Sequence, residues 1–180
     1  RPFRLSSGTN LQESTAGAEF EILFNGDSVP VRTSLMGTHN ISNCLAAAAA
    51  CLSLGVSLSE IALGIERLVT VPGRMERVTC GQSFTVLIDY AHTDDALSHV
   101  IRSAKRLCSQ RVFCVFGAGG DRDTGKRSLL GMAASEADRV IITSDNPRSE
   151  DPAQIIRAVA EGCLNKGVSP EQIIDRREAI

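Results

Sequence analysis

The feature that most constrains this chain is an alternation of short apolar runs with longer amphipathic runs through its second half. The apolar runs span 84–89, 111–116 and 139–143, and they are followed by runs of helical periodicity at 94–107, 126–136 and 151–164. A further short apolar run at 172–175 is predicted as a fourth strand. Strands that alternate with helices of about ten or more residues predict an α/β fold with a mostly parallel, doubly wound sheet.

The first part of the chain has a different pattern. Short β-prone runs at 19–24 and 29–34 are separated by Asn25-Gly26-Asp27, a sequence typical of a hairpin turn. Helices are predicted at 41–54, where five consecutive alanines allow close packing, and at 59–68, with Ser57 or Ser59 as N-cap. Residues 1–18 are polar and small, and no regular structure is predicted for them.

Val71-Pro72-Gly73 interrupts both patterns and marks the predicted domain boundary. Residues 1–70 and residues 71–180 are then expected to belong to different domains, the second of them with the doubly wound sheet. The chain has no initiator Met, and its last residues have the composition of a helix that is just beginning. We therefore expect a fragment of a longer protein.

Composition excludes several classes of protein. The 180 residues carry 19 Lys and Arg against 21 Asp and Glu, a net charge of −2 that is untypical of a dedicated nucleic-acid binder. Apolar residues make up 43%, enough for a sizeable core, but no apolar run reaches the roughly 18 residues of a membrane span. Neither nucleic acid nor membrane is expected as a partner, and we expect a monomer.

The six cysteines contain no CxxC pair, and most lie within apolar segments. This pattern is typical of buried thiols in a reducing compartment, rather than of a disulfide framework or a zinc site. We therefore expect a cytoplasmic protein, and we assign no residue to a metal site.

Polar clusters follow three of the predicted strands. They are Asp89-Tyr90-Ala91-His92-Thr93, Gly117-Ala118-Gly119-Gly120-Asp121-Arg122-Asp123 and Ser144-Asp145-Asn146-Pro147-Arg148. Ligands of open α/β sheets bind outside the carboxyl ends of the strands. One such cluster could be an ordinary turn, but three on one predicted rim favour a binding site.

The glycine-rich loop fits two nucleotide-binding motifs poorly. Gly120, Gly125 and Lys126 match the spacing of a phosphate loop, but Arg127 stands where a Ser or Thr would hold Mg²⁺. Arg122 stands where a dinucleotide fingerprint needs its third glycine. The mixed charges are better suited to a zwitterion, with Arg for a carboxylate and Asp for an ammonium group.

Individual residues indicate more specific contacts. Arg148, after the stiff Pro147, offers a bidentate fork for a carboxylate, although a solvated arginine on a surface turn has the same pattern. Asn40 and Asn43 lie at a predicted helix start, where capping is the commoner role and contact with an adenine edge the alternative. Arg74 lies beside the predicted boundary, and Asp89 could accept hydrogen bonds from ribose hydroxyls.

Several strings stand together in one order along the chain. They are Val71-Pro72-Gly73-Arg74-Met75-Glu76-Arg77, Asp89-Tyr90-Ala91-His92-Thr93, Gly119-Gly120-Asp121-Arg122-Asp123-x-Gly125-Lys126-Arg127, Asp145-Asn146-Pro147-Arg148-Ser149-Glu150-Asp151-Pro152 and Asp175-Arg176-Arg177-Glu178-Ala179-Ile180. Over residues 37–180 the chain resembles the Mur ligases of peptidoglycan synthesis, in particular the branch that adds meso-diaminopimelate. Departures from that branch, such as His39 and Ala118, affect loop stiffness and packing more than charge.

The resemblance implies that residues 1–70 are the C-terminal part of a central ATP-binding domain and that residues 71–180 are a truncated, Rossmann-like domain that binds the amino acid. It also implies roles for ten residues. The amino-acid site would comprise Arg122, Asp145, Asn146, Pro147 and Arg148. The ATP site would comprise Asn40, Asn43, Arg74, Asp89 and His92. The family's phosphate loop, catalytic residues and carbamylated lysine would lie upstream, so no catalytic residue is assigned and the fragment alone is expected to be inactive.

The implied reaction is the ATP-dependent and Mg²⁺-dependent joining of meso-diaminopimelate to UDP-N-acetylmuramoyl-L-Ala-D-Glu through an acyl phosphate. Within the family, the alternatives are a lysine-adding ligase and a folylpolyglutamate synthetase, against which Arg148 argues. Outside it, the alternatives are a dinucleotide-dependent dehydrogenase and a non-catalytic amino-acid-binding module.

Overall fold

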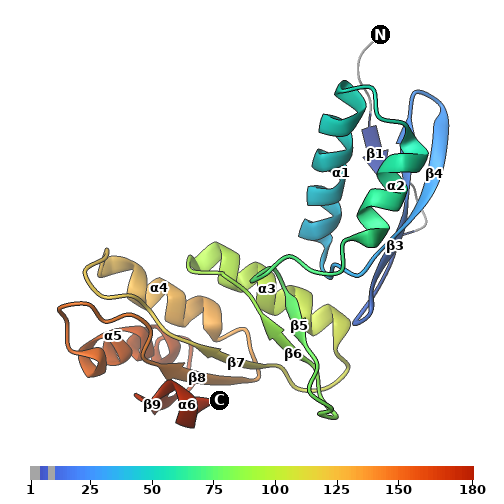
Figure 1. Ribbon diagram of the computed structural model, residues 1–180. Helices are drawn as coiled ribbons and strands as arrows, with labels where there is room; N and C mark the ends of the chain where they lie inside the picture. Colours follow the sequence, from blue (N-terminus) through green and yellow to red (C-terminus); the bar gives the residue numbers. More distant parts are fainter. Residues whose placement is uncertain (1–4, 8–10) are drawn as a thin grey trace. The chain divides into compact units, whose positions relative to one another are not determined.

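The computed structural model describes residues 5–7 and 11–180, which fall into two compact units, Arg1–Tyr90 and Ala91–Ile180 (Figure 1). The boundary between the two units lies after Tyr90, whereas the sequence pattern predicts a domain boundary at residue 71. The division at 71 stays a prediction. Each unit has its own hydrophobic core, and each is described by itself.

The first unit is built on an antiparallel sheet around β3 (Gly17–Phe24). This strand pairs with β1 (Leu5–Ser7), β2 (Gln12–Ser14) and β4 (Asp27–Thr33). No regular structure was predicted for residues 1–18, and this is wrong, because β1 and β2 both form backbone hydrogen bonds with β3. Residues 1–4 and 8–10 lie outside the described part of the chain. The predicted hairpin is confirmed: Asn25 and Gly26 both have positive φ, which a tight two-residue turn between twisted strands requires.

Two helices, α1 (Thr38–Ser53) and α2 (Leu58–Arg67), follow β4 in this unit. Ile41 and Cys44 of α1 and Ile61 and Ile65 of α2 are buried in the same core as Ile22 of β3. The start of α2 has a capping box, in which the Ser57 hydroxyl accepts a hydrogen bond from the Glu60 amide and the Glu60 carboxylate accepts one from the Ser57 amide.

A two-stranded antiparallel sheet follows, made of β5 (Glu76–Val78) and β6 (Val86–Ile88). The run at 84–89 was expected to open the parallel sheet, and this expectation is corrected: it forms only a short strand, and its hydrogen-bonded partner is β5. The backbone returns between the two strands through Gly81 at φ 85°, and Gln82 donates a hydrogen bond to the Val78 carbonyl.

The second unit has a parallel sheet of β7 (Phe113–Phe116), β8 (Arg139–Thr143) and β9 (Glu171–Ile173), in that order. Its helices are α3 (Asp94–Leu107), α4 (Gly125–Ala134), α5 (Pro152–Leu164) and the short α6 (Arg176–Ala179). The predicted α/β class with a parallel sheet is confirmed. Because consecutive strands are neighbours, right-handed crossovers place α4 and α5 on one face of this sheet.

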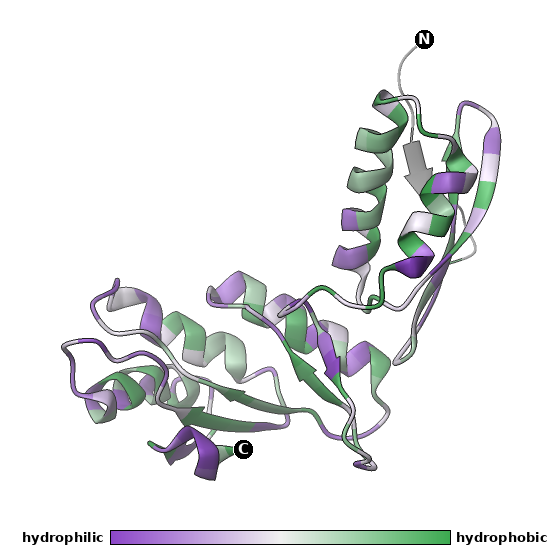
Figure 2. Cartoon of the chain, viewed as in Figure 1, coloured by the Kyte–Doolittle hydropathy of each residue, from purple (hydrophilic) through white to green (hydrophobic). Residues whose placement is uncertain are grey.

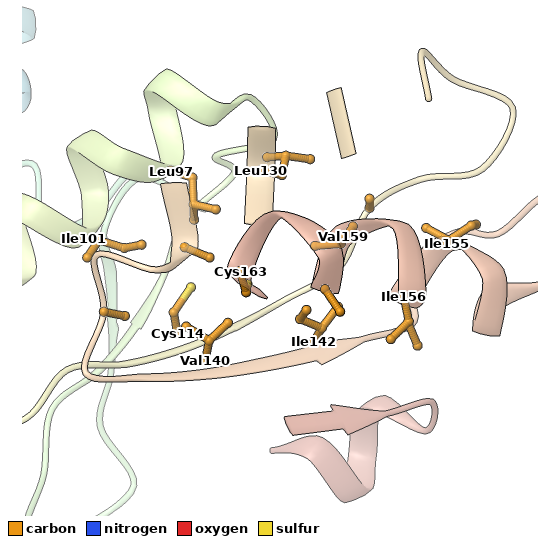
Figure 3. Close-up of a cluster of buried hydrophobic side chains, with 14 residues drawn as sticks. Leu97, Ile101, Cys114, Leu130, Val140, Ile142, Ile155, Ile156, Val159 and Cys163 are labelled. Carbon is orange, nitrogen blue, oxygen red and sulfur yellow. The ribbon is translucent and has the colours of Figure 1, made fainter. Parts of the chain in front are cut away.

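The core of the second unit lies between that face and the helices. Figure 3 shows Leu97 of α3, Cys114 of β7, Ile142 of β8 and Cys163 of α5 pointing into this core. In Figure 2, β7 and β8 are hydrophobic along most of their length, whereas α6 is mostly hydrophilic. Side chains alternate across β7, so Cys114 is buried while Phe113 is 55% exposed.

Small residues allow α4 and α5 to touch backbone to backbone. A Cβ atom added at Gly131 would lie 2.0 Å from the Val159 carbonyl oxygen, and one added at Gly162 would lie 1.9 Å from the Ser128 carbonyl oxygen. Neither glycine has a positive φ, so the need for glycine here is steric.

Among the described residues, no helix is both long and apolar enough to cross a membrane. All six cysteines are free thiols.

Candidate functional site

The loops that follow β7 and β8 lie against each other at the carboxyl end of the parallel sheet (Figure 1). The Gly120 amide donates a hydrogen bond of 2.8 Å to the Asn146 carbonyl oxygen. In the opposite direction, Nη1 of Arg148 donates to the Gly120 carbonyl oxygen. Two of the three polar clusters expected on one rim are thus brought together in space.

Glycines make this approach possible. A Cβ at Gly117 would lie 2.4 Å from the Thr143 carbonyl oxygen, and a Cβ at Gly120 would lie 1.9 Å from that of Pro147. A Cβ at Gly119 would meet Nη1 of Arg148 at 3.1 Å and Cγ of Arg122 at 3.9 Å. Two arginines expected to bind the amino acid therefore both lie next to Gly119.

At least three amides of the glycine loop already have partners within the protein. Besides Gly120, the Asp121 amide donates to Glu150 at 2.5 Å, and the Gly125 amide donates to the Asp123 carboxylate at 3.0 Å. A phosphate loop needs such amides directed at its ligand. The geometry therefore agrees with the sequence argument that this loop does not cradle a phosphate.

A charged pair lies beneath the two loops. Arg127, in the first turn of α4, donates from Nη1 and Nη2 to the two carboxylate oxygens of Glu150, at 2.9 and 2.7 Å. These hydrogen bonds raise the pKa of Arg127, and with the Asp121 amide they lower the pKa of Glu150. Both groups are therefore held in their charged forms.

The remaining residues of the predicted amino-acid site lie at the edge of these loops. Asp145 and Asn146 are exposed and Pro147 is half-buried. Nη2 of Arg176 lies 3.8 Å from a carboxylate oxygen of Asp145, and Nε of Arg176 donates to the Ser144 carbonyl oxygen at 3.0 Å. Ser144, Asp145 and Arg176 line an open hollow that also borders β9 and α6. Asp145 thus lies beside a cation and faces a space that a ligand could enter.

Asn40 and Asn43 lie in the first turns of α1 but do not cap it. The N-cap is Gly37, at φ 88°, without a side-chain hydrogen bond, so the capping alternative is wrong. Asn40 is buried and donates from Nδ2 to the Met36 carbonyl oxygen at 2.8 Å. Asn43 is exposed and donates from Nδ2 to Oδ1 of Asn40 at 3.2 Å. The buried asparagine thus orients the exposed one.

Arg74 and Asp89 belong to one turn structure of the first unit. A carboxylate oxygen of Asp89 accepts a 2.8 Å hydrogen bond from the Met75 amide, which follows the exposed Arg74. Met75 is itself buried, and its sulfur would lie 2.9 Å from a Cβ at Gly37. The start of α1 and the turn at Arg74 are therefore neighbours within this unit.

His92 lies in the second unit, next to Thr93, whose hydroxyl accepts a hydrogen bond from the Ala96 amide and so caps α3. Its cluster follows β6 rather than a strand of the parallel sheet. All three clusters were expected on one rim of the parallel sheet. Only those after β7 and β8 follow strands of that sheet in the part of the chain that the structure describes.

Sequence analysis missed Arg127, Glu150 and Arg176 as parts of this site. A signal was present at Arg127, because a cation in the first turn of a helix opposes the helix dipole and calls for a nearby acid. The identity of that acid depends on a contact across 23 positions in the sequence.

Two protein-family models match this chain. Residues 73–180 match the family model described as "Mur ligase, glutamate ligase domain", and residues 4–51 match the "Mur ligase middle domain". The first of these models alone covers more than half of the chain.

Curated relatives agree with these matches. The UDP-N-acetylmuramoyl-L-alanyl-D-glutamate–2,6-diaminopimelate ligase of Geobacillus kaustophilus is 44% identical over 171 residues, which cover 94% of this chain and 35% of that protein. The enzyme of the same name from Bacillus cereus is 45% identical over 172 residues, 95% of this chain and 35% of that protein. The chain thus spans about a third of the length of these relatives.

Solved structures agree as well. A structure of a UDP-N-acetylmuramoyl-L-alanyl-D-glutamate–2,6-diaminopimelate ligase superposes with a TM-score of 0.64 at 39% identity, over 98% of this chain and 36% of that one. UDP-N-acetylmuramate-alanine ligase of Thermotoga maritima gives a TM-score of 0.73 at 20% identity, over 96% of this chain and 37% of that one, a likeness of fold alone.

Proposed function

This chain belongs to the Mur ligase family, and on that premise we propose that it is the part of an ATP-dependent ligase that selects meso-diaminopimelate and joins it to UDP-N-acetylmuramoyl-L-Ala-D-Glu. The relatives that are 44–45% identical carry the name of that enzyme. The chain supplies the amino-acid site and part of the nucleotide site, and the protein is proposed to work as a cytoplasmic monomer.

One observation carries the proposal: Arg148 and Arg122 both lie next to Gly119, on a rim that also holds Asp145. Meso-diaminopimelate is lysine with an additional carboxylate on its distal carbon. A guanidinium forms charge-assisted hydrogen bonds with a carboxylate, and a carboxylate does so with an ammonium group. The rim therefore has groups for both charges at the distal end of this amino acid, whereas lysine would leave an arginine without its anion.

In this proposal the rim acts by positioning. Arg148 and Arg122 hold the carboxylates, and Asp145 the distal ammonium group, so that the reacting amine is presented to the acyl phosphate formed from ATP and the glutamate carboxylate. Holding two reactants in the right geometry lowers the entropic part of the barrier.

The nucleotide would be approached by Asn40, Asn43, Arg74, Asp89 and His92. The amide of Asn43, oriented by Asn40, suits the edge of an adenine. In the part of the chain that the structure describes, no three His, Cys, Asp or Glu side chains form a metal site, so no step is assigned to Mg²⁺ through these residues.

The test is a ligation assay on the full-length protein that carries this chain. UDP-N-acetylmuramoyl-L-Ala-D-Glu and ATP are supplied with either meso-diaminopimelate or L-lysine, and the product is identified by its mass. Turnover that depends on ATP and favours diaminopimelate supports the proposal. Turnover with lysine alone contradicts the role of Arg148, and turnover with neither contradicts the substrate assignment.

A further inference from the structure

Arg127 occupies an unfavourable place for a cation. Its side chain is only 7% exposed, and it lies in the first turn of α4, at the positive end of the helix dipole. A charge removed from water is costly unless it is paired and hydrogen-bonded, and neutral residues of similar size often serve stability as well or better. Stability of α4 therefore does not explain why an arginine stands here.

Its partner Glu150 connects the two loops of the rim. Besides the two hydrogen bonds from Arg127, a carboxylate oxygen of Glu150 accepts one of 2.5 Å from the Asp121 amide. The Glu150 amide in turn donates to the Pro147 carbonyl oxygen at 3.0 Å, which closes the turn that contains Arg148. The Glu150 carboxylate is thus bonded to α4 and to the loop after β7, and the Glu150 backbone is bonded within the loop after β8.

A second set of hydrogen bonds is donated by the loop after β8 to the loop after β7. The Asp121 carboxylate accepts hydrogen bonds from the amide and the hydroxyl of Ser149, at 3.2 and 2.7 Å. Asp121 and Arg148 both have φ near 50°, a left-handed conformation that non-glycine residues adopt at an energetic cost. Such conformations persist where the surroundings hold them, and here the bonds of Glu150 and Asp121 hold the backbone on both sides.

We infer that Arg127 and Glu150 are positioning residues, which fix the backbone of Asp121 and Arg148 and thereby set the affinity and selectivity for an amino acid with a second, distal carboxylate. The effect on substrate rests on the proposed function. The effect on the two loops does not, and it can be measured without any substrate.

The first experiment uses Glu150→Gln in the full-length protein, with Glu136→Gln as matched control. Glu136 also accepts two hydrogen bonds from an arginine, Arg102, but it joins α3 to the end of α4, away from the rim. Amide hydrogen exchange over 117–123 and 144–150 should become faster in Glu150→Gln and stay unchanged in the control. Unchanged exchange in Glu150→Gln would overturn the inference, whatever the enzyme's substrate.

The second measurement compares the KM values of Glu150→Gln for meso-diaminopimelate and for ATP. For Glu150→Gln we expect the KM for meso-diaminopimelate to rise by about tenfold or more, with the KM for ATP unchanged, because the loss of a charged hydrogen bond is concentrated at the amino-acid rim. The preference for diaminopimelate over lysine should fall in parallel. Equal effects on the KM values for both substrates would show a general structural role and overturn the inference.

Because Glu150→Gln leaves Arg127 buried without its anion, the variant could fold poorly. The double variant Arg127→Met/Glu150→Met removes both charges and avoids this penalty. It should fold, show fast exchange in both loops and keep the raised KM for diaminopimelate. A double variant with wild-type exchange and KM would show that the pair is not needed for positioning. Failure of the wild type to ligate either amino acid would instead contradict the proposed function, while the exchange measurement still decides this inference.

Discussion

A Cβ atom on Gly120 would lie 1.9 Å from the carbonyl oxygen of Pro147, so the loops after β7 and β8 can meet only because residue 120 has no side chain. The need for glycine at this position is steric, since Gly120 does not have a positive φ. It also brings the Gly120 carbonyl oxygen to Nη1 of Arg148. The position of Arg148, the proposed specificity residue, thus depends on the absence of a side chain at Gly120, 28 positions earlier in the sequence.

We therefore expect Gly120→Ala to destabilise the second unit by about 1–3 kcal/mol, the usual cost of overpacking a tight contact. Chemical denaturation followed by circular dichroism measures this. Gly64→Ala is the control, because Gly64 lies in α2 with nothing within 4 Å of the added Cβ. It should be stabilising by about 0.5–1 kcal/mol. Equal stability of Gly120→Ala and the wild type would contradict the close approach of the two loops.

The capping box at the start of α2 gives a prediction for the first unit. Ser57→Ala removes the hydroxyl that accepts from the Glu60 amide and should cost about 1 kcal/mol of unfolding free energy. Ser53→Ala serves as control, because Ser53 at the end of α1 is exposed and its hydroxyl donates only to the Ala50 carbonyl oxygen. If both variants lost the same stability, the cap would have no particular role.

Local patterns explain which parts of the fold could be predicted. The Asn25-Gly26 turn, the helix after Ser57 and the strand at 139–143 are determined by neighbouring residues, and the structure confirms them. The pairing of β6 with β5 depends on a contact between separate segments, and the apolar run at 84–89 carries no information about its partner.

The same distinction holds for the candidate site. The loops after β7 and β8 were predictable, because parallel strands bring their carboxyl ends to one edge. Glu150 stands in the string from Asp145 to Pro152, but its bonds to Arg127 and Asp121 cross 23 and 29 positions of sequence and depend on the fold. Asn40 was expected as a cap or an adenine contact. It is not the cap, because its buried amide bonds to the Met36 carbonyl oxygen and to Asn43, and its contact with an adenine stays a prediction.

The Arg127–Glu150 pair predicts a pH dependence of stability. Arg127 holds the pKa of Glu150 below its ordinary value of 4.5, so the pair stabilises the folded state above that pH and loses its effect as the pH falls through the lowered value. The stability difference between wild type and Glu150→Gln should therefore shrink as the pH falls from neutral to below 4.5, as measured by urea unfolding at each pH. A difference that stays constant with pH would contradict the ion pair.

Thiol reactivity tests the core of the second unit. Burial raises the pKa of Cys114 to about 12, whereas Cys80 is exposed. Because the thiolate is the reactive form, iodoacetamide at about pH 8 should modify Cys80 first and Cys114 only after unfolding, as followed by peptide mass spectrometry. Rapid modification of Cys114 in the folded protein would contradict the packing of β7 under α5.

The central claim is that Arg148 recognises the distal carboxylate of the amino acid. The most direct measurement compares kcat/KM for meso-diaminopimelate and for L-lysine in the full-length protein and in Arg148→Ala. We predict a strong preference for diaminopimelate in the wild type, reduced about 10- to 100-fold in the variant, with the KM for ATP unchanged, because one charged hydrogen-bonding partner is lost. A variant that keeps the wild-type preference, or that loses ATP affinity to the same degree, would contradict the claim.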